Sequence, residues 1–388
     1  MPRPSLIALA PLLLAGFRAA GPGPAWPPPA TPAETVQEEA LAPGITHAEI
    51  VRVARTDGGI EERWVIHVLR LDPLRTRLRI APALDEVLGA ETTSSLADRH
   101  GALAAVNGGY FRTAGLYRGE PAGALALEGR LLSEPDRHRP VVALSAVSEA
   151  PTRVAFTRLL FEANVVVDRS QRLRVGGFNR PRGGDEVVVY TPEFHRTTLT
   201  DRGGFEAVVS RDKVVATREG AGSAAIPPDG FVISASGKAV AEAARLLRRG
   251  ARARLESPLR TDPVLAFRAE TFLGGGPWLL DGGLGAQAVE GEPYAEDFRE
   301  KRHPRTAIGV RDDGAILLVT VDGRQLGWSD GMTIAELTAL MEGLGCRDAL
   351  NLDGGGSTTM VVRGRVVNRP SDPTGERAVS DAILVFAR

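Results

Sequence analysis

The sequence predicts an α+β fold, with a mixed, strand-rich sheet core and a few packed helices. Segments in which every second residue is apolar recur along the chain and outnumber the helical patterns. The helical patterns are few and widely separated, so they do not alternate with strands as a βαβ array would. The composition, 43% hydrophobic and 24% charged, is that of a globular protein and excludes fibrous or wholly disordered classes.

The first part of the chain is predicted to be a signal peptide at residues 1–20, followed by a linker at residues 21–43. Arg3 gives a positive start, and residues 6–15 form an apolar run that is too short to span a membrane. The following stretch is rich in Pro, Gly and Ala, a composition that cannot build a core. We therefore expect an exported protein in the periplasm, the cell envelope or outside the cell. After cleavage it should have no integral membrane segment, and residues before about 40 should pack on nothing. The alternative is a disordered leader with no targeting role.

Residues 44–388 are predicted to form one domain, with a variable central region at about residues 145–235. Alternating residues around Trp64, Ile66 and Val68 predict a strand, in which His67 is expected to be a structural histidine. Helices are predicted at residues 92–101, 238–249 and 333–344. The last of these has a capping-box sequence at its start and a glycine stop at Gly345.

Charge and cysteine content exclude several classes of function. The chain has 47 basic and 48 acidic residues, a net charge of −1, which argues against a nucleic-acid partner. Cys346 is the single cysteine, so neither an internal disulfide nor a Cys-pair zinc site is expected. The histidines lack metal-binding spacing.

The glycine-rich loops do not match nucleotide-binding motifs. The GAGSAA run at residues 220–225 fits a dinucleotide pattern, but Pro227 and Pro228 follow where a helix should begin. The SGKA run at residues 236–239 lacks the first glycine and the final Ser or Thr of a phosphate-binding loop. No GxSxG elbow is present.

Three segments share another form, in which an apolar strand delivers a polar residue next to glycine. They are centred on Asn107, Asp322 and Asp353. Glycine lets the backbone approach a ligand closely, and successive N–H groups can form an anion-binding nest. Each segment alone is compatible with an ordinary turn. The three together favour a site, and arginines in nearby loops offer planar forks that match phosphate or carboxylate.

These segments resemble the phosphodiester glycosidase family. The matching motifs are NGGYF at residues 107–111, GGGPWLL at 274–280, RTAIG at 305–309 and VDGR at 321–324. They continue with NLDGGGST at residues 351–358, NRPSD at 368–372 and GER at 375–377. The order and spacing fit over roughly residues 44–387, with the central region the weakest part. The resemblance implies a hydrolase that cleaves the glycosidic C–O bond of a sugar-1-phosphodiester in exported or cell-envelope polysaccharide.

The residues available for such chemistry follow from the same motifs. A phosphodiester is a good leaving group, so it needs stabilisation of its developing charge more than a second carboxylic acid. Asp353 is the expected direct participant and Asp322 its close partner, with Arg305 and Arg324 as anion clamps. Arg324 is also expected to orient Asp322. The expected substrate-binding residues are Asn107, Gly108, Gly109, Gly275, Gly354, Gly355, Gly356, Ser357, Thr358, Asn368, Ser371, Asp372, Glu376 and Arg377.

Two other functions remain open from the sequence. One is a non-catalytic envelope polysaccharide-binding protein, although the aspartates favour an enzyme. The other is a metal-dependent phosphodiesterase that cuts P–O, with ligands from His303, Asp322, Asp353 and Asp372. No cofactor is expected to be required, with a bound divalent cation left open by that second alternative. The expected partner is a sugar-1-phosphodiester or a phosphate-containing glycan.

Overall fold

The computed structural model describes residues 33–55, 59, 61–285 and 294–388. Within these residues the chain forms six sheets and four short α-helices, which confirms the predicted α+β class. Most neighbouring strands are antiparallel, and the one parallel pair in the described part joins two short strands, β13 and β14. The predicted signal peptide lies outside the described residues.

The largest sheet has eight antiparallel strands in the order β1-β2-β3-β24-β23-β25-β21-β22. Its central strands are almost wholly buried and rich in Val, Ile and Leu, as expected of a sheet covered on both faces. The strands are β1 (Ala33–Ala42), β2 (Ile45–Arg55), β3 (Glu61–Leu71), β24 (Ile316–Val321), β23 (Arg305–Arg311), β25 (Cys346–Asn351), β21 (Trp278–Asp281) and β22 (Leu284–Gly285).

A second, five-stranded sheet has the order β27-β26-β6-β29-β4, and the pair β5 and β28 lies at its end. Its longest pairing joins β4 and β29 over seven residues, so the C-terminal strand is held in the core of the fold. The strands are β27 (Arg365–Val366), β26 (Met360–Val362), β6 (Ala104–Asn107), β29 (Asp381–Ala387), β4 (Thr76–Pro82), β5 (Glu91–Thr92) and β28 (Ala378–Val379).

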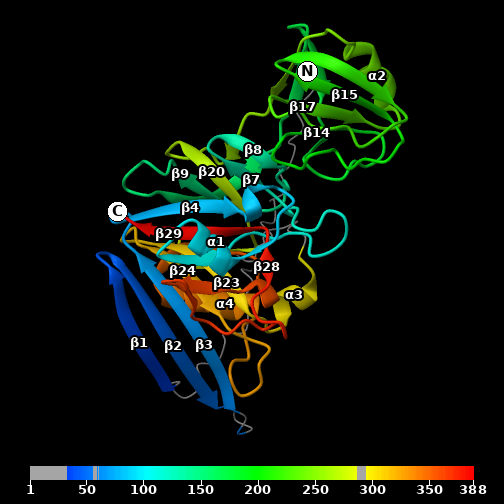
Figure 1. Ribbon diagram of the computed structural model, residues 1–388. Coiled ribbons are helices and arrows are strands. Elements are labelled where there is room, and N and C mark those ends of the chain that lie inside the picture. The colour runs from blue at the N-terminus through cyan, green and yellow to red at the C-terminus, as the bar shows by residue number, and fades with distance from the viewer. Residues whose placement is uncertain (1–32, 56–58, 60, 286–293) are drawn as a thin grey trace, which may run out of the picture.

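These two sheets pack on each other, and a helix covers the outer face of each. Alternate residues of one strand show the layering, because Leu318 of β24 joins the core between the sheets while Leu317 faces the other way. On that outer face α4 (Ile334–Gly343) packs through Leu337. The second sheet is covered by α1 (Thr93–Arg99) through Leu96. The site-bearing strand ends therefore sit on a rigid, four-layer body (Figure 1).

A third sheet connects this body to a separate lobe. Its order is β19-β10-β9-β20-β7-β8. Strand β10 comes just before the lobe in the chain, and β19 comes just after it. The two strands pair side by side, with Leu160 opposite Arg260. The strands are β7 (Leu125–Leu127), β8 (Arg130–Ser133), β9 (Val141–Ser145), β10 (Val154–Leu160), β19 (Arg260–Asp262) and β20 (Ala269–Gly274).

The lobe, residues 164–256, projects from the body and is drawn in green in Figure 1. It overlaps the central region that the sequence set apart. Its first and last strands, β11 and β18, pair with each other, and α2 packs on its sheets. The elements are β11 (Asn164–Val167), β12 (Gln171–Arg174), β13 (Gly177–Phe178), β14 (Val187–Tyr190), β15 (Phe205–Ser210), β16 (Lys213–Glu219), β17 (Gly230–Ala235), α2 (Ala239–Leu246) and β18 (Ala253–Glu256).

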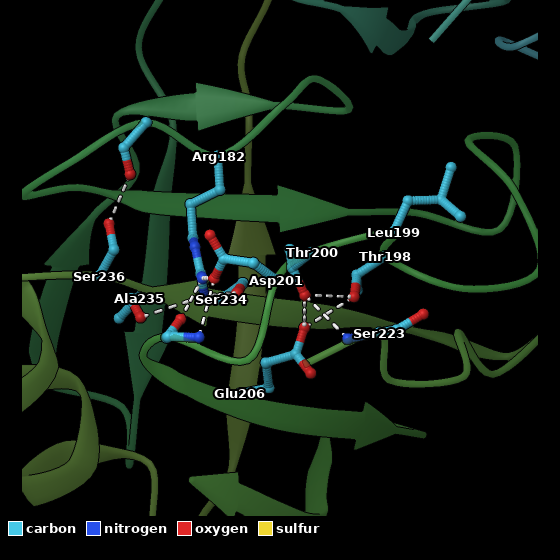
Figure 2. Close-up of polar contacts among 12 residues, drawn as sticks. Arg182, Thr198, Leu199, Thr200, Asp201, Glu206, Ser223, Ser234, Ala235 and Ser236 are labelled. Atoms are coloured by element: carbon cyan, nitrogen blue, oxygen red, sulfur yellow. Dashed lines mark hydrogen bonds and ion pairs between the residues drawn. The ribbon is translucent and has the colours of Figure 1, made fainter. Parts of the chain in front are cut away.

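The lobe contains a buried carboxylate, Glu206, whose contacts are internal (Figure 2). Its Oε1 accepts hydrogen bonds from the hydroxyls of Thr198 and Thr200, at 2.7 and 2.8 Å. Its Oε2 accepts from the backbone N–H of Ala224 at 3.1 Å. Because both oxygens already have donors, Glu206 stabilises the lobe and is not a candidate for chemistry.

The predicted helices are confirmed, and the predicted linker is wrong in its second half. Thr333 caps α4, and a capping box with Glu336 is present. Residues Ala33–Ala42, expected to be unstructured up to residue 43, form strand β1, which pairs along β2 from Ala33 opposite Val53. The strand is largely exposed, so backbone pairing with an available sheet edge holds it where composition predicted no structure.

Candidate active site

Hydrogen bonds to Asp353 connect the end of β6 with the end of β25. The side-chain amide of Asn107 donates to the carbonyl oxygen of Asp353 at 2.7 Å. The backbone N–H of Asp353 donates to the carbonyl oxygen of Gly108 at 3.1 Å. Asn107 belongs to the five-stranded sheet and Asp353 follows the eight-stranded sheet, so both main-chain groups of Asp353 are held across the interface between the sheets.

The carboxyl of Asp353 is surrounded by protein, although part of the residue reaches solvent. Its Oδ1 accepts from the backbone N–H of Gly354 at 2.9 Å. Burial raises the pKa of this carboxyl to about 6, while hydrogen bonds from Ser357 and Gly354 and the charge of Arg377 oppose that rise. A carboxyl with a pKa this close to neutral can exchange a proton during a reaction.

Arg377 lies on one side of the glycine turn that follows Asp353. Its guanidinium donates to both oxygens of Asp372, at 2.8 and 2.9 Å, and to the hydroxyl of Ser357 at 3.5 Å. A side chain at Gly356 would collide with both members of this pair and would displace them. The two-pronged contact fixes the plane of the guanidinium beside the Asp353 loop.

Arg324 lies on the other side of the same turn and is exposed. Its Nε donates to Nδ1 of His303 at 3.2 Å, and a Cβ placed on Gly355 would be 3.2 Å from both of its terminal nitrogens. Among the described residues it forms no ion pair. The prediction that Arg324 orients Asp322 is therefore wrong, because its backbone adopts a left-handed conformation, φ 60°, and the side chain contacts His303 instead. Burial and the charge of Arg324 lower the pKa of His303, which keeps the imidazole neutral as an acceptor.

Asp322 is fully buried, and its carboxylate is saturated with donors. It accepts from the indole N–H of Trp328 at 2.9 Å, the amide of Asn368 at 3.0 Å and the backbone N–H of Arg369 at 3.0 and 3.1 Å. Burial raises the pKa of Asp322 against these hydrogen bonds. In this position the carboxylate organises the neighbouring loop, and no contact with Asp353 is present.

Arg305 is 1% exposed and points into the protein. Its Nε donates to the carbonyl of Met332 at 2.7 Å, and its Nη2 donates to the carbonyls of Phe298 and Lys301 at 2.7 and 3.0 Å. Burial lowers the pKa of the guanidinium to about 10. These contacts tie α3 (Glu296–Glu300) to the sheet, so the guanidinium of Arg305 holds the structure together where an anion clamp was expected.

Several expected substrate-binding groups also have internal partners. Asn107 is fully buried, and its Oδ1 accepts from Thr306 and Thr359. The carboxylate of Glu376 accepts from the backbone and hydroxyl of Ser94, at 2.8 and 2.5 Å, at the start of α1. Asn368 links Asp322 to the carbonyl of Thr358, and Thr358 itself is 1% exposed. The hydroxyl of Ser371 is buried and has no hydrogen-bond partner in the described part of the chain.

The glycine loop itself is compact. Gly355 donates its N–H to Pro304, Ser357 to Gly354 and Thr358 to Gly355, so these N–H groups are not free for an anion. Gly275 packs closely against Leu350, and Gly108 and Gly109 lie against Asp381. The predicted nest is therefore largely closed, and the anion-binding capacity at the turn lies in the arginine side chains.

Asp381 is a functional candidate that sequence reasoning missed. It is 1% exposed, accepts from the N–H of Gly109 at 2.7 Å and from the hydroxyl of Ser380 at 2.6 Å. Its charge helps to raise the pKa of Asp353, and burial raises its own pKa. The signal was available only as the sequence SDA at residues 380–382, which looks like the start of an ordinary closing strand.

Within the described residues, no group of three or more His, Cys, Asp or Glu side chains has a metal-binding arrangement. Two of the four ligands considered for a metal are engaged elsewhere, since His303 contacts Arg324 and Asp372 contacts Arg377. The expectation that no cofactor is required stays a prediction.

Comparison with known proteins gives a family match and several relatives. A phosphodiester glycosidase family model matches residues 203–386. The prophage-derived uncharacterized protein YomE of Bacillus subtilis is 45% identical over 84 residues, which are 22% of this chain and 13% of YomE. Mouse N-acetylglucosamine-1-phosphodiester alpha-N-acetylglucosaminidase is 32% identical over 120 residues, 29% of this chain and 22% of that enzyme. The matches thus span under a quarter of either relative's length. A Burkholderia pseudomallei protein, named as exported, has a crystal structure that superposes with a TM-score of 0.80 at 26% identity, over 96% of this chain and 100% of that one.

Proposed function

We propose that this protein hydrolyses the glycosidic C–O bond of a sugar-1-phosphodiester, on the premise that residues 203–386 match the phosphodiester glycosidase family model. In this proposal Asp353 is the reacting group, and the phosphate binds between Arg324 and Arg377. The chemical class of substrate is a sugar such as N-acetylglucosamine joined through its C1 phosphate to a larger glycan.

One observation carries this proposal: two arginines flank the glycine turn that begins at the perturbed carboxyl of Asp353. Arg324 lies against Gly355, and Arg377 lies against Gly356. Arg324 has no carboxylate partner in the described part of the chain, so it can bind a phosphate oxygen without losing an existing ion pair. Arg377 is held in place by Asp372, which fixes its direction while neutralising part of its charge.

The reaction then needs one carboxylate and a charge clamp. Water attacks the anomeric carbon and transfers a proton to Asp353, while the bond from C1 to the bridging oxygen breaks. The electron pair of that bond stays on the bridging oxygen, and the product leaves as a phosphomonoester whose new negative charge faces the arginines. Because a phosphate is a much weaker base than an alkoxide, no second carboxylic acid is needed to protonate it.

The proposal includes export to the cell envelope or beyond, where phosphate-containing polysaccharides are exposed. The similar Burkholderia pseudomallei protein is named as exported, and the sequence begins with the apolar run discussed above. None of the helices in the described residues is long and apolar enough to cross a membrane.

Hydrolysis of a methyl phosphodiester of N-acetylglucosamine-1-phosphate in oxygen-18 water tests the proposal. We expect free sugar to carry the label at C1 and methyl phosphate to carry none. Label in the phosphate instead would indicate P–O cleavage and refute the C–O assignment. Binding without turnover would favour the polysaccharide-binding alternative. Arg324→Ala should raise KM for the diester, and Arg70→Ala, which removes an exposed arginine of β3 that pairs with Asp313, is the control.

A further inference from the structure

A cavity of about 370 Å³ with several charged lining residues opens at the junction between the body and the lobe. Its size falls within the range of ordinary ligand sites. The loop after β6 and the loop after β8 provide most of its walls, and the lobe provides one side chain. The charged residues that line it are Arg112, Glu120, Glu134, Asp136, Arg139 and Arg180.

The charges around this cavity alternate and balance. Arg112 pairs with Glu120, Arg180 donates to Glu134 at 2.7 Å, and Arg139 lies 3.8 Å from Asp136. Burial raises the pKa of Glu120 to about 7. A lining with equal numbers of positive and negative groups does not favour a highly charged ligand. It offers donors and acceptors side by side, which is what sugar hydroxyls need, because each hydroxyl both donates and accepts.

The cavity adjoins the candidate active site through an aromatic contact. The guanidinium of Arg139 lies 5.3 Å from the ring centre of Tyr110 and 5.2 Å from that of Tyr294. The hydroxyl of Tyr110 accepts from the amide of Asn351 at 2.8 Å, two residues before Asp353. Nη1 of Arg139 donates to the carbonyl oxygen of Ala122 at 2.9 Å, and this bond fixes the guanidinium in the cavity wall.

We propose that this cavity is a subsite for a further sugar of the glycan that carries the phosphodiester. The proposal rests on the proposed function for its substrate class. It implies that an extended glycan contacts the body and the lobe together, and that the enzyme prefers an internal or multi-unit substrate to a single capped sugar.

The test compares two substrates and two variants. The substrates are the methyl phosphodiester of N-acetylglucosamine-1-phosphate and a tetramer of N-acetylglucosamine-1-phosphate units. In Arg112→Ala and in Glu120→Gln we expect kcat/KM for the tetramer to fall about tenfold, the effect of losing a hydrogen bond to a charged group, mainly through KM. The methyl diester should be hydrolysed within twofold of the wild-type rate. Arg172→Ala, which removes an equally exposed ion-paired arginine of the lobe, is the control.

Equal losses on both substrates, or no loss on the tetramer, would overturn the subsite. A binding measurement separates this result from failure of the proposed function. Calorimetry of the tetramer with Asp353→Asn, with and without Arg112→Ala, should show about tenfold weaker binding when Arg112 is absent. If wild-type protein hydrolyses neither substrate, the proposed function fails. In that case, a tetramer affinity that depends on Arg112 supports the subsite, and an affinity that does not depend on Arg112 refutes it. Thermal melting of each variant confirms that the fold is retained.

Discussion

Replacing Asp353 with Asn should impair catalysis and stabilise the folded protein at the same time. The amide keeps the size of the side chain, and its oxygen still accepts from the N–H of Gly354. The change removes the group proposed to take the proton from water, so kcat should fall by about 10² or more. The same change also removes a buried charge, which favours the folded state wherever the wild-type carboxyl would be ionised.

The size of the stability effect follows from the pKa. Asp353 has its pKa raised from 3.8 to about 6 in the folded protein. A raised pKa means that the folded state binds the proton more tightly, so this stabilising contribution is complete below about pH 3.8 and is lost as the pH rises through 6. The full difference corresponds to about 3 kcal/mol in the free energy of unfolding. The stability advantage of Asp353→Asn over wild type should therefore grow between pH 4 and pH 7.

Two measurements test this reasoning. Release of free sugar from the methyl phosphodiester gives kcat, and chemical denaturation at pH 4, 5, 6 and 7 gives the free energy of unfolding. For wild type, kcat/KM should fall about tenfold from pH 7 to pH 5, because about one Asp353 carboxyl in ten is ionised at pH 5. Near-wild-type turnover in Asp353→Asn, or a stability difference that does not change with pH, would refute the assignment of a perturbed catalytic carboxyl.

Three further predictions concern the carboxylates around this group. Asp381→Asn should move the acid limb of the kcat/KM profile to lower pH, because its charge helps to raise the pKa of Asp353; an unchanged limb would separate the two residues. Asp322→Ala should destabilise the protein by about 3 kcal/mol in urea denaturation, since several buried donors lose their acceptor; a stable but inactive variant would instead indicate contact with substrate. Glu376→Ala should lower stability by about 1 kcal/mol through the loss of its hydrogen bonds to Ser94 in the first turn of α1, with kcat/KM unchanged; loss of activity without loss of stability would support the original substrate-binding assignment.

The fold class was predictable from the sequence because it rests on local patterns. Alternating apolar residues indicate strands wherever they occur, and the capping box of Thr333 and Glu336 marks the start of a helix. A polar residue between an apolar strand and a glycine run marks a strand end, and Asp353 is placed in this way. Its contact with Asn107, 246 positions away in sequence, agrees with the expectation that the separate motifs converge.

Side-chain direction was not predictable, because it depends on contacts that are distant in sequence. Arg305 and Arg324 have similar local surroundings in the sequence, yet one donates to buried carbonyls and the other lies exposed beside Gly355. The role of Asp381 depends on the N–H of Gly109, which belongs to a different strand end. Strand β1 was missed because composition describes the intrinsic preference of a segment and not the sheet edge available to it.

The paired strands at the base of the lobe have a consequence for how such proteins can diversify. Leu160 and Arg260 face each other in the β10–β19 pairing, so the roughly hundred residues between them enter and leave at one point of the body. An insertion anchored in this way can lengthen, shrink or be exchanged while the strand registers of the body are preserved. Asp353, Arg324 and Arg377 all lie outside that stretch, whereas Arg180 lies within it. Under the proposed function, selectivity for the extended part of a substrate can therefore evolve, or be engineered, by exchanging one continuous segment while the proposed bond-breaking residues are retained.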